Sequence, residues 1–305
     1  MSRLFTAYVL CGWSAASKPA TGADNISIAV LKRDVRFRLT FESYSVTTRT
    51  EAEVRLNQIL DDLKKRGEKA LLGFDFPLGL PRGLASALKL STQPAWRAVW
   101  DHLIKTVKDK PNNLNNRFGV AADINRRTND GPFPFWGCPP RDTLTTLQPK
   151  KTREHGPDDL PENRLADIAL KTGRSPWKLY FNGSIGGQII LGVPVIGRLK
   201  AAKADALKIW PLETGWQALS PADLDGVEVV VVEINADLAK ATPFPGEAKP
   251  LAQLRTLAEH FAKLDEAGKL GAAFAAPAGT DPETVAAVES EEGWPLIVLA
   301  QATSF

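Results

Sequence analysis

Two acidic residues stand where apolar segments of the chain end, and an ionised side chain is costly to bury there. Asp75 follows the apolar segment 70–74, and Glu233 ends the valine-rich segment 227–232. A buried carboxylate requires a hydrogen-bonded partner or a metal ion. Since ligands and metals collect at the carboxyl ends of strands in open α/β sheets, the two residues predict a site where divalent cations activate water. Asp75 also has a simpler interpretation, as a carboxylate that caps the following turn through backbone N–H groups.

Two other carboxylates are candidate ligands of the same centre. Glu213 follows the short apolar segment 207–211, and Asp265 lies near the end of the amphipathic segment 251–266. An acid late on a helix is more commonly solvated, because it is unfavourable near the negative end of the helix dipole. Both residues are therefore candidates for a third metal ligand, and the alternative is an ordinary solvated carboxylate.

Two short segments could bind a phosphate group. The segment Gly183-Ser-Ile-Gly-Gly-Gln188 opens a predicted helix, where free backbone N–H groups favour anions, so Ser184 and Gly186 are candidate substrate-binding residues. Asn116 and Arg117 lie in a basic segment and could grip a phosphate through charge-assisted hydrogen bonds. The alternatives are close helix packing for the glycines and loop-stabilising hydrogen bonds for Asn116 and Arg117.

The composition restricts the type of site and the class of protein. The chain has 305 residues, 44% of them hydrophobic and 24% charged, as in an ordinary globular protein. Two cysteines and three histidines are too few for a disulfide framework or a His-rich metal site, so a metal would be bound by oxygen, which favours Mg²⁺ or Mn²⁺. Residues 1–20 lack the pattern of a signal peptide and no run is long enough to span a membrane, so we expect a cytoplasmic protein without membrane contact.

The positive charge of the chain is concentrated in one region. The net charge is only +3, but residues 82–160 hold 13 Lys and Arg against 8 Asp and Glu, together with six Trp and Phe side chains. Basic and aromatic residues together can follow a phosphate backbone and stack on bases, which makes nucleic acid or a nucleotide a candidate partner. The alternative is a small helical lobe whose aromatic side chains form its own core.

The order of predicted elements indicates an α/β fold. Strands are expected at 5–11, 26–31 and 35–41, followed by a helix at 51–66 and a strand at 70–76. Helices at 184–203, 251–266 and 283–291 and strands at 207–211, 227–234 and 295–300 follow. The strand-strand-strand-helix-strand start is typical of a ribonuclease-H-like mixed sheet. We expect one domain over residues 1–305, with a mainly helical insertion lobe at about 82–180.

Several motifs, taken in order, resemble a bacterial protein family. They are Tyr8-Val-Leu-Cys-Gly-Trp-Ser-Ala-Ala-Ser-Lys-Pro19, Gly73-Phe-Asp-Phe-Pro-Leu-Gly-Leu-Pro81, Asn115-Asn-Arg-Phe118, Phe135-Trp-Gly-Cys-Pro139, Trp210-Pro-Leu-Glu-Thr-Gly215, residues 253–268 and Glu291-Glu-Gly-Trp294. The family consists of uncharacterised proteins regarded as ribonuclease-H-like nucleases, and some members carry a label for molybdopterin guanine dinucleotide synthesis. The resemblance runs from about residue 6 to residue 298 and implies the fold more firmly than an activity.

The chain departs from the family pattern around the proposed centre. Relatives carry Val-Asp-Trp-Ser where this chain has Cys11-Gly-Trp-Ser14, and Gly12 has no side chain to coordinate a metal. Asn235-Ala236 stands in place of Tyr-Pro, and Lys249-Pro250 in place of Lys-Asp. The resemblance therefore implies a metal site that is weakened or lost.

These patterns support three hypotheses. In the first, the protein is a metal-dependent phosphodiester hydrolase: Asp75 and Glu233 bind Mg²⁺ or Mn²⁺, Asp265 or Glu213 is a third ligand, and Arg117 or the helix start at 183–188 holds the phosphate. In the second, favoured by Gly12, the protein binds a nucleotide or nucleic acid without catalysis. The third is an accessory role in molybdenum-cofactor nucleotide chemistry, and it rests only on the labels of relatives.

Overall fold

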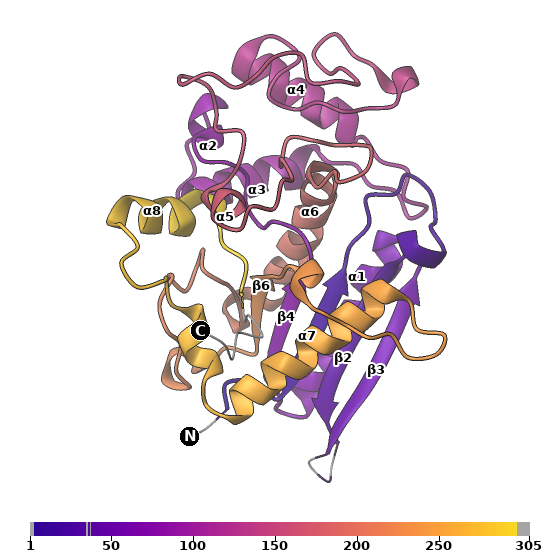
Figure 1. The fold of residues 1–305 in the computed structure, drawn as a ribbon, viewed down its shortest axis with the longest axis vertical. Helices are drawn as coiled ribbons and strands as arrows, with labels where there is room; N and C mark the ends of the chain where they lie inside the picture. The colour runs from indigo at the N-terminus through magenta and orange to yellow at the C-terminus, as the bar shows by residue number, and fades with distance from the viewer. Residues whose placement is uncertain (1–2, 35, 37, 298–305) are drawn as a thin grey trace.

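A six-stranded sheet forms the centre of the protein (Figure 1). The structure is a computed structural model, which describes residues 3–34, 36 and 38–297. The strands are β1 (Ala7–Gly12), β2 (Ile26–Arg33), β3 (Leu39–Val46), β4 (Ala70–Phe74), β5 (Leu207–Ile209) and β6 (Val229–Glu233). They lie in the order β3-β2-β1-β4-β6-β5, with β1, β2 and β3 antiparallel and β1, β4, β6 and β5 parallel. The expected α/β class with a mixed sheet is confirmed.

Helices cover both faces of this sheet. The long ones are α1 (Arg49–Lys65), α6 (Gly186–Lys203) and α7 (Lys249–Glu266). Because successive strand residues point to opposite faces, Val9 and Leu72 pack in one core with α1 and α6, whereas Leu10 and Leu71 pack in a second core under α7. In Figure 1, α7 crosses the front of the sheet, with α1 and α6 behind it. The central strands are therefore apolar on both faces, which explains their continuous hydrophobic sequence.

The chain between β4 and α6 forms the insertion lobe. Its helices are α2 (Leu84–Ala87), α3 (Ala95–Thr106), α4 (Arg117–Asn129) and α5 (Leu165–Ala169). Trp100, Phe135 and Trp177 are buried and belong to the same core as the α6 face of the sheet. Most aromatic side chains of the lobe are thus buried, but the core that they join is shared with the sheet, whereas the alternative interpretation of this segment expected a core of the lobe's own. Figure 1 shows α3 and α4 beyond the upper ends of the strands.

The hairpin between β2 and β3 differs from the expectation. We expected a strand at 35–41, whereas β3 covers Leu39–Val46, and residues 35 and 37 lie outside the described residues. The carboxylate of Asp34 accepts hydrogen bonds from the backbone N–H groups of Arg36 and Arg38, which bends the chain there. The strand then continues through half-exposed polar residues, which a search for apolar segments misses.

The C-terminal elements also differ in detail. The expected helix at 283–291 is α8 (Pro282–Ala287) followed by a π-helical turn at Val288–Glu292. Of the expected strand at 295–300, Pro295 forms an isolated bridge with Glu233, and residues 298–300 lie outside the described part of the chain. None of the helices in the described ranges is long and apolar enough to cross a membrane.

Candidate functional site

A polar hollow of about 210 Å³ lies beyond the carboxyl ends of β4 and β6. Its charged lining residues include Asp75, Glu233, Asp237, Arg164, Lys171 and Arg174. The hollow therefore lies where ligands bind in open α/β sheets, and it offers charges of both signs. Residues of the insertion lobe form one side of it, because Arg164 and Asp167 belong to α5 and its flank.

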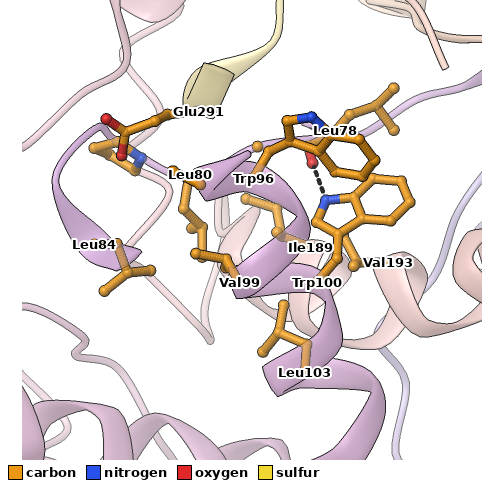
Figure 2. Close-up of a pocket in the computed structure, with 13 residues that line it drawn as sticks. Leu78, Leu80, Leu84, Trp96, Val99, Trp100, Leu103, Ile189, Val193 and Glu291 are labelled. Carbon is orange, nitrogen blue, oxygen red and sulfur yellow. Dashed lines mark hydrogen bonds between the residues drawn. The ribbon is translucent and has the colours of Figure 1, made fainter. Parts of the chain in front are cut away.

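The pocket in Figure 2 has a different character. It lies between α3 and α6 and has a volume of only about 10 Å³, which is room for at most one water molecule. The indole N–H of Trp100 donates a hydrogen bond of 2.9 Å to the carbonyl oxygen of Leu78, as the figure shows. The contacts there join the lobe to the sheet and leave no space for a ligand.

Asp75 lies at the floor of the polar hollow. Its backbone N–H donates to the carbonyl oxygen of Cys11 at 2.9 Å, which continues the pairing of β4 with β1. Its Oδ1 accepts a hydrogen bond of 3.0 Å from the backbone N–H of Ala236, in the turn after β6. Burial raises the pKa of Asp75 to about 6, although the Ala236 hydrogen bond opposes the shift. The carboxylate caps a turn, but that turn follows the neighbouring strand rather than its own.

Glu233 borders the same hollow but is bound to an arginine. Arg164 donates from Nη1 to Oε2 at 2.7 Å and from Nη2 to Oε1 at 2.8 Å, and the backbone N–H of Leu78 donates to Oε2 at 3.2 Å. Both oxygens are thus engaged, and the charge is neutralised by a bidentate pair. The expectation that Glu233 is a free metal ligand is therefore corrected by this contact.

The register of the strands adds a second reason. Glu233 pairs with Phe74, so it stands level with the residue before Asp75. Since side chains alternate along a strand, Asp75 and Glu233 leave the sheet toward opposite faces. Both carboxylates line the hollow, but they reach it from opposite faces of the sheet, which does not favour a shared cation.

Asp265 lies at the opposite end of the parallel strands, next to the start of β1. Its two carboxylate oxygens accept hydrogen bonds of 2.8 Å from the backbone N–H groups of Leu4 and Phe5, and the hydroxyl of Tyr8 also donates to it at 2.8 Å. These residues precede or begin β1, whereas Asp75 lies past the other end of the parallel strands. The candidate role of Asp265 in the centre is therefore corrected to a structural one, which fastens the N-terminal segment to α7.

Glu213 does not line the hollow either. Its Oε2 accepts a hydrogen bond of 3.0 Å from the backbone N–H of Ile209, and its Oε1 lies 3.1 Å from Nζ of Lys200 in α6. The residue therefore closes the turn after β5 and neutralises a buried lysine. Its candidate role as a metal ligand is replaced by these two contacts.

Two of the predicted phosphate-binding residues, Asn116 and Gly186, are engaged in structural contacts. Asn116 accepts from the backbone N–H of Lys108 at 2.7 Å and donates to the carbonyl of Thr106 at 3.0 Å, which ties off the end of α3. The N–H of Gly186 donates to the carbonyl of Lys178 at 2.9 Å, so it is not free for an anion. Packing explains Gly186, because a Cβ there would lie 2.3 Å from the carbonyl oxygen of Pro176. Ser184 is half-exposed just before α6.

Arg117 is the predicted residue with the most unusual surroundings. It is only 3% exposed, and its Nη1 donates to Ser17 at 2.8 Å and to Asn115 at 3.0 Å. Its Nε has no hydrogen-bond partner and faces the first turn of α6, where a Cβ on Gly187 would lie 3.4 Å away. The structure thus brings Arg117 to the helix start that the sequence marked as a phosphate site.

Sequence reasoning missed Arg164. It holds Glu233 and also contacts Asp167, whose carboxylate lies 3.1 Å from both Nε and Nη2. The only sequence signal was the spacing of Arg164 and Asp167 in a short helical segment, and nothing in it pointed to Glu233. Gly12 proves to lie beside Asp75, and a Cβ there would meet only Cδ1 of Leu254 at 3.5 Å.

The donor set does not fit a two-cation centre. In the hollow, Asp75 has a carboxylate oxygen without a protein partner, whereas Glu233 is bound through both oxygens by Arg164. Within residues 3–34, 36 and 38–297, no group of three or more His, Cys, Asp or Glu side chains could hold a metal ion. Comparison with family models, curated proteins and solved structures found no match to this chain.

Proposed function

We propose that this chain is a ribonuclease-H-like protein that binds the phosphate group of a nucleotide or nucleic acid in the hollow beyond β4 and β6, without two-metal catalysis. The observation that carries this proposal is the bidentate pair between Arg164 and Glu233, which occupies a carboxylate that a metal centre would need. The ribonuclease-H-like assignment is supported by the element order β1-β2-β3-α1-β4, with three antiparallel strands followed by a parallel one.

One positive charge of the hollow is available to an anionic ligand. Four acidic and three basic residues line the hollow, and Lys171 and Arg174 come from the loop after α5 at its rim. Arg174 forms an ion pair with Asp237, whereas no ion pair of Lys171 occurs among the described residues. Asp75 at the floor has a pKa of about 6, so the cost of its negative charge falls as the pH decreases toward that value. We therefore expect phosphate-bearing ligands to bind more tightly at pH 5.5 than at pH 8.

A second candidate, slow phosphodiester hydrolysis with one Mg²⁺ or Mn²⁺, is favoured by Asp75 itself. Mg²⁺ keeps several waters and can be bound through one or two carboxylates together with substrate phosphates. Asp75 is the one acid at the centre of the hollow whose carboxylate is not in an ion pair among the described contacts. The two candidates share the ligand class and differ in whether a cation is required.

Binding and hydrolysis assays on three variants separate these candidates. The variants are Asp75→Asn, Gly12→Asp, which has room for a second carboxylate beside Asp75, and Asp205→Asn as a control that removes an exposed carboxylate before β5, at the other end of the parallel strands. In EDTA, we expect Asp75→Asn to bind a labelled oligonucleotide or nucleotide about threefold or more tightly, because a buried negative charge is removed. Wild type should show no Mn²⁺-dependent hydrolysis.

The opposite results identify the hydrolase. If wild type cleaves a phosphodiester with Mn²⁺ and Asp75→Asn loses both cleavage and Mn²⁺-dependent binding, cation-dependent phosphodiester hydrolysis replaces our proposal. Cleavage that appears only in Gly12→Asp would identify a former enzyme that has lost one ligand, and it would support the binding function of the present chain. If Asp75→Asn changes neither binding nor hydrolysis, the hollow is not the ligand site.

A further inference from the structure

One buried arginine lacks a carboxylate partner. Four arginines are buried in the described part of the chain, namely Arg49, Arg117, Arg164 and Arg255. Arg49 pairs with Asp109, Arg164 with Glu233 and Asp167, and Arg255 with Glu247 and Glu259. No ion pair of Arg117 occurs among the described residues, although the residue is only 3% exposed. Because a buried charge without a counter-ion is unfavourable, an anion from outside the chain would stabilise Arg117.

Positive charge lies close to Arg117, and the carboxylates of Asp142 and Asp109 offset it only from beyond ion-pair distance. Its guanidinium group faces the N-terminal turn of α6, an 18-residue helix whose start carries a partial positive charge. Burial and the nearby charge of Arg49 lower the pKa of Arg117 to about 10, although Asp142, Tyr180 and Asp109 act in the opposite direction. Arg117 is therefore still charged at neutral pH. Two positive groups face each other with Nε left without a partner, an arrangement that an anion between or beside them would stabilise.

Aromatic rings lie next to this positive centre. The guanidinium carbon of Arg117 is 4.3 Å from the ring centre of Phe118, and Phe118 meets Tyr180 edge-on at 6.3 Å. Tyr180 in turn contacts Phe181 at 4.7 Å, and these two side chains are 39% and 51% exposed. Phe181 also has a φ of +70°, a conformation that is unfavourable for a bulky residue. The aromatic ledge, defined as Phe118, Tyr180 and Phe181, thus presents two exposed rings, Tyr180 and Phe181, before the start of α6, with Phe118 half-buried next to Tyr180.

We infer that Arg117, the start of α6 and the aromatic ledge form a nucleotide subsite, in which the phosphate neutralises Arg117 and the base stacks on Tyr180 or Phe181. Stacking on exposed rings is independent of base identity, and a phosphate satisfies a buried guanidinium in the same way that a carboxylate does. The ligand is a free nucleotide or one unit of a single strand. This inference rests on the proposed function and shares its ligand class. Arg117 and the aromatic ledge do not line the Asp75 hollow, which touches the start of α6 only through Ile185.

Binding and melting measurements test the subsite. We would measure binding of inorganic phosphate, AMP and a labelled single-stranded decanucleotide to wild type, Arg117→Gln and Phe181→Ala. Arg66→Gln is the matched control, since it removes one arginine charge at the far end of α1. We expect Arg117→Gln to weaken all three ligands tenfold or more, Phe181→Ala to weaken AMP and the decanucleotide but not phosphate, and Arg66→Gln to stay within twofold of wild type.

Thermal melting guards against a folding defect. We expect phosphate or AMP to raise the melting temperature of wild type but not that of Arg117→Met. Without ligand, Arg117→Met should melt at or above the wild-type temperature, because an unpaired charge is removed.

Equal binding by wild type and Arg117→Gln would overturn the inference. A decanucleotide that binds far more tightly than AMP identifies a single strand as the source, whereas equal affinities identify a free nucleotide. Loss of binding in Arg117→Gln with no effect of Asp75→Asn would retain this subsite and reject the hollow.

Discussion

At the scale of single residues, the environment of Asp75 decides its chemistry. The carboxylate lies at the edge of the hollow, largely enclosed by protein, and accepts one hydrogen bond, from the backbone N–H of Ala236, so burial raises its pKa from 3.8 to about 6. A carboxyl group with this pKa can exchange a proton near neutral pH, as general acids and bases do. The same shift also has a consequence for stability that can be measured without a ligand.

The raised pKa predicts that Asp75 lowers stability as the pH rises. The folded state holds the proton more tightly than the unfolded state, so the contribution is most favourable below pH 4 and is lost between about pH 4 and pH 6. The full loss is about 3 kcal/mol, from 1.36 kcal/mol per pKa unit. We expect Asp75→Asn, which keeps an acceptor for Ala236, to be more stable than wild type at pH 8 and about equal at pH 4.

Urea unfolding of both proteins at several pH values checks this prediction. The difference in unfolding free energy should follow a single titration centred between pH 4 and pH 6, and the NMR signal of the Asp75 carboxyl carbon should titrate near pH 6. A constant difference across the pH range would show that Asp75 is not buried in solution as it is here.

The residue scale also shows the limit of prediction from sequence. Asp75 and Glu233 were recognisable because an acid after an apolar strand segment is unusual whatever surrounds it. The partner of Glu233 could not be recognised from the sequence. Arg164 is 69 positions away, and only the fold of the lobe brings it to Glu233. The same limit applies to Arg117. Its place in a basic segment made it a candidate phosphate-binding residue, but only the tertiary structure shows that it has no carboxylate partner among the described residues.

At the scale of secondary-structure elements, glycines determine how closely α6 approaches the sheet. A Cβ on Gly192 would lie 2.2 Å from Cζ of Phe76, which follows β4 and is itself buried. Gly119 in α4 is also helical, but a Cβ there would meet nothing within 4 Å. Helix propensity favours alanine at both positions by about 1 kcal/mol, so only the packing distinguishes them.

These two glycines give a matched pair of variants. We expect Gly192→Ala to lower the free energy of unfolding by about 1–3 kcal/mol, because Phe76 must move from its packed position. Gly119→Ala should raise it by up to about 1 kcal/mol. Chemical denaturation measures both changes. Equal effects of the two substitutions would contradict the close contact between α6 and Phe76, which also lines the hollow.

The elements differ in how well the sequence predicts them. The apolar strands β1, β4 and β6 and the amphipathic helix α7 follow from their patterns, because both signals reflect burial directly. The strand β3 was misplaced, since its burial pattern mixes exposed and half-exposed residues at the edge of the sheet. Register was beyond prediction, and it is the register of β4 against β6 that separates Asp75 from Glu233.

At the scale of the whole molecule, the insertion lobe is fastened to the sheet by a polar network around Arg164. This side chain extends from the start of α5 to Glu233 at the end of β6, and it also donates to the carbonyl of Glu292 at 3.2 Å. The carboxylate of Glu292 in turn accepts from the backbone N–H groups of Arg82 and Leu165. The network therefore joins the two ends of the lobe, β6 and the C-terminal turn at one place.

A double-mutant cycle on Arg164 and Glu233 tests whether this network holds the lobe. Each side chain is almost fully buried. Arg164→Met leaves the charges of both Glu233 and Asp167 without their arginine and should lower the free energy of unfolding by about 3–5 kcal/mol. Glu233→Gln leaves Arg164 paired with Asp167 and should cost less. The double variant Arg164→Met/Glu233→Gln should lose less than the sum of the two single losses, because Asp167 is then the one partner of Arg164 left unpaired. Additive losses would show that the two charges act independently. Proteolysis of residues 130–165 should be faster in Arg164→Met than in the double variant, since Arg164→Met also strands the charge of Glu233 at the contact between the lobe and β6.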